Sequence, residues 1–282
     1  MIRPGTILGG RYRLDAHVSS GGMGEVWRGH DSVEDRPIAV KVLHPSMNDE
    51  PGFVARFRAE AKAMSTINHP GVVRIYDFIE DPAVGTYLVM QYVDGEALAR
   101  TLVRVKRLTA ARTMALVAQA GDALAAVHRA GVIHRDVKPG NLLVRRDGSL
   151  VLTDFGIART ADAPALTAPG SVVGTAAYLA PEIAMGERAT ELSDVYSLGV
   201  VAYQCLAGRR PFDGGSPMEV ATRQVREPPP PLPRDVPASA KAVVDRAMAK
   251  RPQDRFPNAE TFAEEARRVA IELGVTGPVR AG

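Results

Sequence analysis

Apolar and polar residues follow two different patterns along the chain. The first third holds short runs rich in β-branched and aromatic residues, separated by Gly, Asp or Pro clusters, and this pattern is typical of strands. The runs are 12–14, 26–28, 38–43, 72–78 and 87–93, and one helical segment near 51–68 interrupts them. We therefore predict a small lobe over residues 1–93, built of a five-stranded sheet and one helix.

After Gly95 the apolar residues recur at helical spacing. Residues 109–130 and 194–207 predict long helices, and β-type residues return only around 141–153. We predict a larger, mainly helical lobe over 94–273, followed by a Gly- and Pro-rich tail over 274–282 that frays. The expected fold class is α+β with two lobes.

Composition narrows the choice of function. The 282 residues are 45% apolar and 24% charged, and the net charge is only +3. Because no run of five or six Lys and Arg residues occurs, a nucleic-acid-binding role is disfavoured. The single cysteine, Cys205, excludes an internal disulfide, and the histidines form no metal-binding cluster. No signal segment or long apolar stretch is present, so we expect a soluble chain without a membrane segment.

A glycine-rich segment, Val18-Ser-Ser-Gly-Gly-Met-Gly-Glu-Val26, lies between two predicted strands. Its glycines at 21, 22 and 24 would let backbone N–H groups approach an anionic ligand without a Cβ in the way. A plain hairpin turn would have the same composition. The segment is no P-loop, because no Gly-Lys-Ser/Thr follows it.

One lysine and one glutamate are candidates for an ion pair. Lys41 ends the apolar run Ile-Ala-Val-Lys, although lysines on edge strands are common. At 100° per residue Glu60 falls inside the apolar stripe of the following helix, where a carboxylate needs a cation. The stripe consists of Phe53, Phe57, Ala61, Met64 and Ile67. Lys41 is the natural partner, and the alternative is that Glu60 reaches solvent at the border of the stripe.

The strongest local signal is His134-Arg-Asp-Val-Lys-Pro-Gly-Asn141, followed after twelve residues by Asp154-Phe-Gly. The Asp-Gly pair at 147–148 predicts a two-residue hairpin turn, which would place Asn141 opposite Asp154 on one face. Two oxygen-bearing side chains at that place suit Mg²⁺. Asp136 can reach the same place as a base for a hydroxyl proton, and Lys138 can offset phosphoryl charge.

Together these motifs, with Ala180-Pro-Glu182, resemble the eukaryotic-type (Hanks) protein kinases in their bacterial serine/threonine branch. The receptor-like kinases of actinobacteria, of the PknA/PknB kind, look most similar. The resemblance covers about residues 12–270. It implies a bilobal kinase fold and an enzyme that transfers the γ-phosphoryl group of ATP, with Mg²⁺ or Mn²⁺, to Ser and Thr hydroxyls of proteins.

The resemblance also implies a role for each matching residue. Catalytic roles fall to Asp136, Lys138, Lys41 and Glu60, and metal binding falls to Asn141 and Asp154. Residues implied to bind the nucleotide are Val18, Ser19, Gly21, Gly22, Gly24, Val26, Ala39, Lys41, Met90, Gln91, Val93 and Leu143. Structural roles are implied for Arg135, Glu182 with its partner Arg255, and Asp194, which would brace the His-Arg-Asp loop. Ser19 replaces the first loop glycine, and Gln91 replaces the commoner glutamate.

Regulation and partners follow as further expectations. Thr167, with Ser171 second, is expected to be autophosphorylated and to contact Arg135, although both could be ordinary loop residues. Lys138 and the Gly174-Thr175 pair before Tyr178 are similar to kinases that modify Ser and Thr. We also expect a homodimer through the small lobe and a cytoplasmic location, either as a free kinase or as part of a membrane-anchored one.

Two other functions compete with this interpretation. A nucleotide-binding pseudokinase or scaffold would lack part of the catalytic set, whereas Lys41, Asp136, Asn141 and Asp154 are all present. The proline-rich stretch 228–233 could dock a proline-binding domain, but a surface spacer between helices is the favoured explanation.

Overall fold

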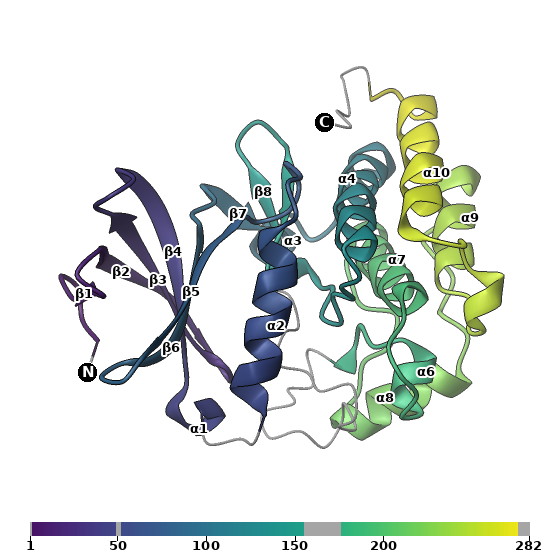
Figure 1. The fold of residues 1–282 in the computed structure, drawn as a ribbon. Coiled ribbons are helices and arrows are strands. Elements are labelled where there is room, and N and C mark those ends of the chain that lie inside the picture. The colour runs from purple at the N-terminus through teal and green to yellow at the C-terminus, as the bar shows by residue number, and fades with distance from the viewer. Residues whose placement is uncertain (1, 49–51, 155–175, 276–282) are drawn as a thin grey trace. The chain divides into compact units, whose positions relative to one another are not determined.

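The computed structural model describes residues 2–48, 52–154 and 176–275 (Figure 1). The chain divides into two compact units, Met1–Asn68 with Val73–Asp94, and His69–Val72 with Gly95–Gly282. The second unit takes in the short segment His69–Val72 because Val72 forms a parallel bridge with Leu152, whose N–H donates to the carbonyl of Gly71. The border between the two units in the sequence therefore lies after Asp94. The apolar pattern did not predict that His69–Val72 belongs to the second unit.

The first unit contains an antiparallel sheet of six strands in the order β1-β2-β3-β4-β6-β5. The strands are β1 (Ile7–Leu8), β2 (Tyr12–Gly21), β3 (Gly24–Asp31), β4 (Arg36–Leu43), β5 (Ile75–Asp81) and β6 (Gly85–Gln91). The prediction of five strands was wrong. The additional strand, β1, has only two residues and pairs with Tyr12 and Arg13, so it is too short to leave a period-2 pattern.

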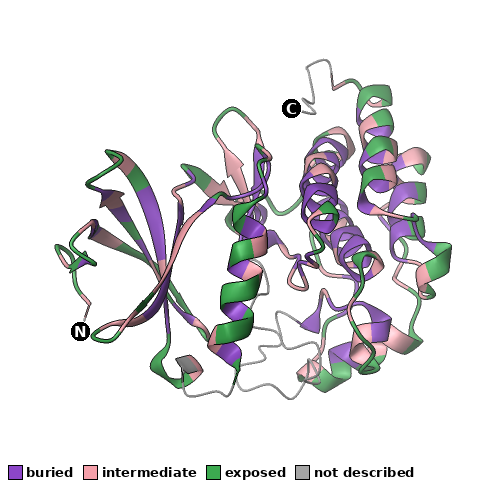
Figure 2. Cartoon of the chain, in the orientation of Figure 1, coloured by how far each residue is buried: buried purple, intermediate pink, exposed green. Residues whose placement is uncertain are grey.

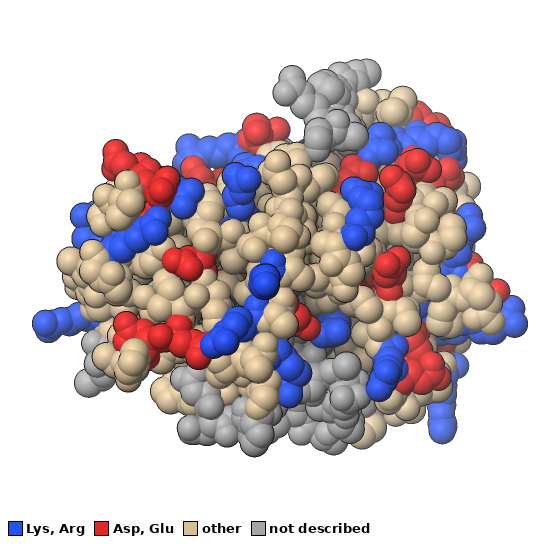
Figure 3. Space-filling view, viewed as in Figure 1, with Lys and Arg blue, Asp and Glu red and all other residues tan. Residues whose placement is uncertain are grey.

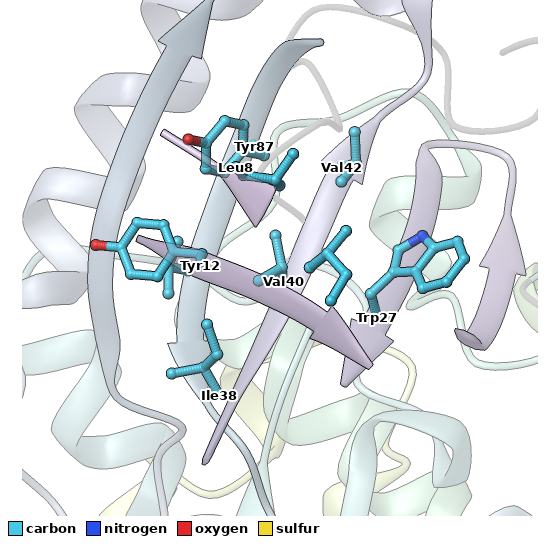
Figure 4. Packing of buried hydrophobic residues seen from close by; sticks show 9 residues of the cluster. Leu8, Tyr12, Trp27, Ile38, Val40, Val42 and Tyr87 are labelled. Carbon is cyan, nitrogen blue, oxygen red and sulfur yellow. The ribbon is translucent and has the colours of Figure 1, made fainter. Parts of the chain in front are cut away.

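Apolar side chains from one face of this sheet form its core (Figure 4). The cluster consists of Leu8, Tyr12, Leu14, Trp27, Ile38, Val40, Val42, Tyr87 and Val89. The hydroxyl of Tyr12 on β2 donates to Asp77 on β5 at 2.8 Å. Since β3, β4 and β6 lie between these two strands in the sheet, the sheet must curl to bring the two residues together. Since side chains alternate along a strand, Ala39 and Lys41 point to the other face of β4.

The described residues of the first unit also form two helices, α1 (Pro45–Asn48) and α2 (Phe53–Ser65). The buried residues of α2 are Phe53, Phe57, Ala61 and Met64, which belong to the predicted stripe. Glu60 is half-buried beside them. Helix α2 packs against β5, and the ring of Phe57 lies 5.7 Å from that of Phe78.

The described part of the second unit is mainly helical and also holds a small sheet in the order β7-β8-β9. Its strands are β7 (Gly95–Ala97), β8 (Leu142–Arg145) and β9 (Leu150–Leu152). Its helices are α3 (Leu98–Val105), α4 (Ala110–Arg129), α6 (Pro181–Ala184), α7 (Glu191–Ala207), α8 (Pro217–Arg226), α9 (Ala238–Ala247) and α10 (Ala259–Glu272), with 3₁₀ turns η1 (Pro139–Asn141) and η2 (Pro252–Asp254).

Helices α4 and α7 form the core of the second unit and are buried along most of their length (Figure 2). Helix α4 packs against α7 and α10, and α7 packs against α9. Gly121 makes the close approach of α4 and α10 possible, because a Cβ there would lie 2.9 Å from the Cβ of Ala263. Helix α7 begins at a capping box formed by Thr190 and Ser193 and ends at Gly208, which has φ 74°.

On the face drawn in Figure 3, blue and red side chains are interspersed and do not gather by sign. This distribution agrees with the small net charge of +3. Across residues 2–48, 52–154 and 176–275, none of the helices is both long enough and apolar enough to cross a membrane.

Candidate active site

A buried carboxylate holds the loop that carries His134, Arg135 and Asp136. Asp194 lies in the first turn of α7, and its Oδ2 accepts from the backbone N–H of His134 at 2.8 Å. Its Oδ1 accepts from the N–H of Arg135 at 2.9 Å. Arg135 has φ 63°, a left-handed conformation that costs a non-glycine residue free energy unless its surroundings hold it. The structure thus brings Asp194 beneath the loop that it was expected to brace.

His134 links the loop to the end of β9. Its Nδ1 accepts from the N–H of Asp136 at 3.2 Å, so the proton of a neutral ring sits on Nε2. Nε2 then donates to the carbonyl of Thr153 at 3.1 Å. Burial lowers the pKa of His134, and this favours the same neutral ring. His134 therefore acts as a neutral spacer that sets the backbone position of Asp136.

The carboxylate of Asp136 is held from two sides. The Nζ of Lys138 lies 2.7 Å from its Oδ2, and the Nδ2 of Asn141 donates to the same oxygen at 3.0 Å. Asn141 also donates to the carbonyl of Asp136 at 2.8 Å. The side chains of Asp136 and Lys138 keep 14% and 28% exposure, so a substrate can still reach them. This arrangement orients a carboxylate for hydrogen bonding to an incoming hydroxyl.

The predicted hairpin register was wrong by one residue. The turn is a three-residue loop in which the N–H of Gly148, at φ 84°, donates to the carbonyl of Arg145. Pairing therefore follows Leu142↔Leu152 and Val144↔Leu150, and Thr153 is bonded to the carbonyl of Asn141. An Asp-Gly pair occurs both in two-residue hairpin turns and in three-residue loops that end with a left-handed glycine. The sequence alone therefore did not distinguish the two loop lengths.

Asn141 and Asp154 nevertheless lie together, because neither residue belongs to the regular ladder. Asn141 ends the 3₁₀ turn η1, and Asp154, which Thr153 separates from the end of β9, has φ 52°. The Nδ2 of Asn141 lies 3.4 Å from the carbonyl oxygen of Asp154. The contacts of the Asn141 side chain with Asp136 and Asp154 all use its amide nitrogen, so its amide oxygen takes no part in them.

Asn141 and Asp154 fit a magnesium ion that is bound by phosphate groups as well as by the protein. Among the described residues no cluster of three or more His, Cys, Asp or Glu side chains forms a metal site. Mg²⁺ does not require one, because it usually takes one or two protein oxygens and completes its shell with phosphates and water. An amide oxygen at Asn141 and a carboxylate at Asp154 are oxygen donors of that type.

The glycine-rich segment forms the tip of the β2–β3 hairpin. Gly21 pairs with Gly24, which leaves Gly22 and Met23 as the turn. A Cβ added at Gly21 or Gly22 would meet no atom within 4 Å. Gly24 is different, because at φ 144° a Cβ would lie 1.9 Å from the carbonyl oxygen of Val42. The tip therefore offers open backbone, whereas Gly24 is required by packing.

The remaining predicted nucleotide residues lie on several strands of the first unit, with one in the second. Val18 and Ser19 are exposed on β2, and Val26 on β3 pairs with Lys41 on β4. Ala39 pairs with Met90, and both are buried. The N–H of Gln91 donates to the carbonyl of Arg74. Val93 is buried, and Leu143 is half-buried on β8 of the second unit.

Lys41 and Glu60 are both half-buried in the first unit. Lys41 also pairs with Leu88 in the sheet, and Glu60 lies on α2. Their ion pair stays a prediction.

Glu182 and Arg255 form a buried bidentate ion pair. Arg255 Nη1 and Nη2 donate to Oε1 and Oε2 of Glu182, each at 2.7 Å, and Ser193 donates to Oε1 at 2.8 Å. Burial opposes ionisation of Glu182, but Arg255 outweighs it and holds the pKa of that carboxyl below its usual value. The segment that follows Ala180-Pro is therefore tied to the end of η2.

Sequence reasoning missed His128. Its Nε2 lies 2.8 Å from Oδ2 of Asp194, and its side chain is buried in the last turn of α4. The available signal was a histidine within an apolar helix, where a buried ring needs a polar partner. The phosphorylation candidates Thr167 and Ser171 lie outside the described residues.

Comparison with known proteins agrees with this geometry. The protein kinase domain family matches residues 12–266. Serine/threonine-protein kinase PknA of Mycobacterium tuberculosis is 44% identical over 271 residues, which are 95% of this chain and 63% of PknA. Serine/threonine-protein kinase PknB of Mycolicibacterium smegmatis is 41% identical over 93% of this chain and 43% of PknB. The chain thus spans less than two thirds of the length of these relatives.

A crystal structure of the Mycobacterium tuberculosis PknI kinase domain, a double mutant, superposes with a TM-score of 0.77 at 27% identity. The superposition covers 96% of this chain and 99% of the chain of the PknI kinase domain. The predicted family and the predicted α+β fold class are confirmed by these matches. The chain belongs to the protein kinase domain family and has its fold, with a β-sheet N-lobe and a helical C-lobe.

Proposed function

We propose that the chain is a serine/threonine protein kinase that transfers the γ-phosphoryl group of ATP to hydroxyl groups of proteins. The observation that carries the proposal is the fixed orientation of the Asp136 carboxylate. Its carboxylate is oriented by Lys138 at 2.7 Å and by Asn141 at 3.0 Å, on a loop that Asp194 holds from below. A scaffold that only bound nucleotide would gain nothing from a positioned carboxylate of this kind.

Asp136 is the group that orients the acceptor hydroxyl and accepts its proton. Lys138 stays within reach of the same substrate atoms and offsets negative charge on the phosphoryl group as it moves. Catalysis of this type consists of positioning and electrostatics, with no covalent intermediate on the protein. The polar contacts of the loop supply that positioning before substrate arrives.

Members of the protein kinase family use ATP with a divalent metal, generally Mg²⁺. Asn141 and Asp154 would hold the ion in this chain, and Mn²⁺ is expected to substitute. The ion supplies positive charge next to the phosphates. The amide oxygen of Asn141 is suited to the task because its amide nitrogen already serves Asp136.

ATP itself is assigned to the residues that the family resemblance named. The open backbone at Gly21 and Gly22 would receive phosphate oxygens, and Lys41, paired with Glu60, would bind the α- and β-phosphates. Gln91 would accept from adenine through its carbonyl, since its N–H is already used by Arg74. Val18, Val26 and Ala39 would contact the purine.

Regulation by autophosphorylation is part of the proposal. Phosphate on Thr167 or Ser171 would form a charge-assisted contact with Arg135. Mass spectrometry after incubation with and without ATP tests this, and an active enzyme that stays unmodified there would rule it out. A homodimer through the N-lobe and a cytoplasmic location stay predictions.

The decisive experiment compares Asp136→Asn with Asp147→Asn in transfer of ³²P from ATP to a generic basic protein. Asp136→Asn keeps the size of the side chain but removes the base, so transfer should fall at least about 10²-fold. Asp147 lies in the exposed β8–β9 turn and serves as the matched control. Transfer at the wild-type rate by Asp136→Asn would refute the proposed function.

A further inference from the structure

The end of α3 and the residues just after it form an exposed run of alternating aliphatic and basic side chains. The run is Val103-Arg-Val-Lys-Arg107, and Val103 and Val105 keep 73% and 40% exposure. Single apolar residues at a surface are ordinary, so the two valines alone indicate nothing. Their basic neighbours are the informative feature, because few kinds of surface can cover both.

Two arginines of α3 lie on the same side of the helix as Val103. At about 100° per residue, Arg100 and Arg104 fall next to Val103 and opposite the buried Leu98 and Leu102. Both arginines are exposed. The outer side of α3 therefore presents an aliphatic side chain flanked by two guanidinium groups.

Two further segments of the second unit bring cations to the same place. A Cβ on Gly208, at the end of α7, would lie 3.2 Å from the carbonyl oxygen of Lys106, and the exposed Arg209 follows Gly208 directly. The segment before α9 meets the run at Asp235, which accepts from Nη2 of Arg107 at 2.8 Å. The basic patch is defined by the two valines and by the cations Arg100, Arg104, Lys106, Arg107, Arg209 and Arg234.

The basic patch has more positive charge than its carboxylates offset. Glu96 pairs with Arg104 at 2.7 Å, and Asp235 pairs with Arg107 at 2.8 Å. Six cations and two carboxylates give the patch a charge of +4, whereas the whole chain has +3. Among the residues that the structure describes, no carboxylate forms an ion pair with Arg100, Lys106, Arg209 or Arg234.

The backbone of the exposed run is fixed by the protein itself. The N–H of Lys106 donates to the carbonyl of Leu102 at 2.9 Å, and Lys106 has a left-handed φ of 67°. The N–H of Leu108 donates to the carbonyl of Cys205 on α7 at 2.8 Å. A lysine keeps such a φ only where its surroundings hold it, so the patch is formed before any partner binds.

We propose that the basic patch binds the surface of a lipid bilayer that contains anionic phospholipids. At such a surface, cations lie at the level of the lipid phosphates while neighbouring aliphatic side chains enter the acyl region. A docking protein fits less well, because the buried centre of a protein interface is depleted of lysine and of charge in general. Nucleic acid offers phosphates but no apolar layer for Val103 and Val105. Bilayer binding requires no phosphoryl transfer, so it goes beyond the proposed function.

Sedimentation of the chain with vesicles tests the proposal without any measurement of activity. Vesicles of phosphatidylcholine and phosphatidylglycerol in equal amounts should bind the wild-type chain. Vesicles of phosphatidylcholine alone should bind it at least about tenfold more weakly, because they lack the negative surface potential. Equal binding to both kinds of vesicle, or binding to neither, would overturn the proposal.

The charge of the patch is tested by combining Arg100→Gln with Lys106→Gln. Each cation near an anionic membrane surface contributes about a fivefold factor, so the double variant should bind the mixed vesicles roughly twentyfold more weakly. The matched control combines Lys62→Gln with Arg226→Gln, which removes one exposed lysine from α2 and one exposed arginine from α8. Equal weakening in both variants would show that net charge alone drives binding and that the patch has no special role.

The aliphatic side chains distinguish a bilayer from other polyanions. Val103→Ser keeps every charge, so it should weaken binding to the mixed vesicles several-fold and leave binding to heparin, a soluble polyanion, unchanged. Val33→Ser is the control, because Val33 of the first unit is exposed to 67% and lies outside the patch. Unchanged vesicle binding by Val103→Ser would show that the patch binds polyanions in general, and the bilayer would be the wrong occupant. Thermal unfolding of each variant checks that the fold persists.

Discussion

The loop of His134, Arg135 and Asp136 in the second unit and the glycine-rich tip of the first unit are built in opposite ways. In the loop, Asp194, His134, Lys138 and Asn141 give polar partners to backbone and side chains alike. At the tip, Gly21 and Gly22 face open space. The comparison teaches that this chain fixes the groups to which we assign the chemistry and leaves exposed the backbone that we assign to phosphate.

The largest effect should follow from removing the brace of the loop. Asp194→Ala leaves two buried N–H groups and His128 without their acceptor. We expect phosphoryl transfer to fall about 10²-fold or more, and the free energy of unfolding to fall by about 3 kcal/mol. Urea unfolding and initial rates measure both. Near-normal transfer would mean that the loop keeps its shape unaided and that the contrast with the tip is unfounded.

The next effect concerns the base of the glycine hairpin. Gly24→Ala places a Cβ within 1.9 Å of the carbonyl of Val42, in a left-handed region that alanine avoids. The free energy of unfolding should fall by about 2–3 kcal/mol as β3 and β4 separate locally. A thermal melt suffices, and an unchanged melting temperature would show that the tip and its base are equally permissive.

A third prediction concerns Asp31, a buried carboxylate of the first unit whose two oxygens accept from the Arg11 side chain. The hydrogen bonds from Arg11 lower the pKa of Asp31 to about 2. A lowered pKa stabilises the fold fully above about pH 4, the unfolded value, and this contribution is lost as pH falls toward 2. Arg11→Gln should therefore weaken the acid dependence of the urea midpoint between pH 5 and pH 3.

The matched control for Arg11→Gln is Arg13→Gln, two residues farther along the chain in β2. Arg13 and Asp15 form an exposed pair, with side-chain exposures of 55% and 30%, which should contribute little. Equal acid dependence in both variants would show that burial of Asp31 does not matter.

The smallest change in stability is expected at the tip itself. Gly22→Ala adds a methyl group where no atom lies within 4 Å, so the melting temperature should stay within about 2 °C of wild type. The KM for ATP should rise several-fold, because the methyl group stands where phosphate would approach. An unchanged KM for ATP would remove Gly22 from the nucleotide site.

Local patterns in the sequence predicted most of the elements that carry the site. The run at 38–43 lies within β4, and the stripe on α2 is buried as expected, because both are decided by residues next to one another. Strand β1 was missed, since two residues show no periodicity. The turn at Gly148 was misjudged, because loop length depends on backbone angles that the letters Asp-Gly do not specify.

The contacts between residues far apart in the sequence were predicted from the family resemblance and not from the pattern of apolar residues. His134 and Asp194 are 60 residues apart, and no periodicity links a loop to a helix that far along the chain. The hydrogen bond from Nε2 of Gln224 on α8 to the carbonyl of Ala177 lay beyond both approaches, because one glutamine in an amphipathic helix looks like any surface residue until its burial is known.

The β8–β9 hairpin also has a consequence for how the chain can change. Asn141 sits in a 3₁₀ turn and Asp154 has left-handed backbone, so strand parity does not govern where they point. Insertions or deletions at the far bend can alter the pairing of β8 and β9 while these two residues keep their places. The bend is therefore the natural site for grafting a reporter peptide into this chain.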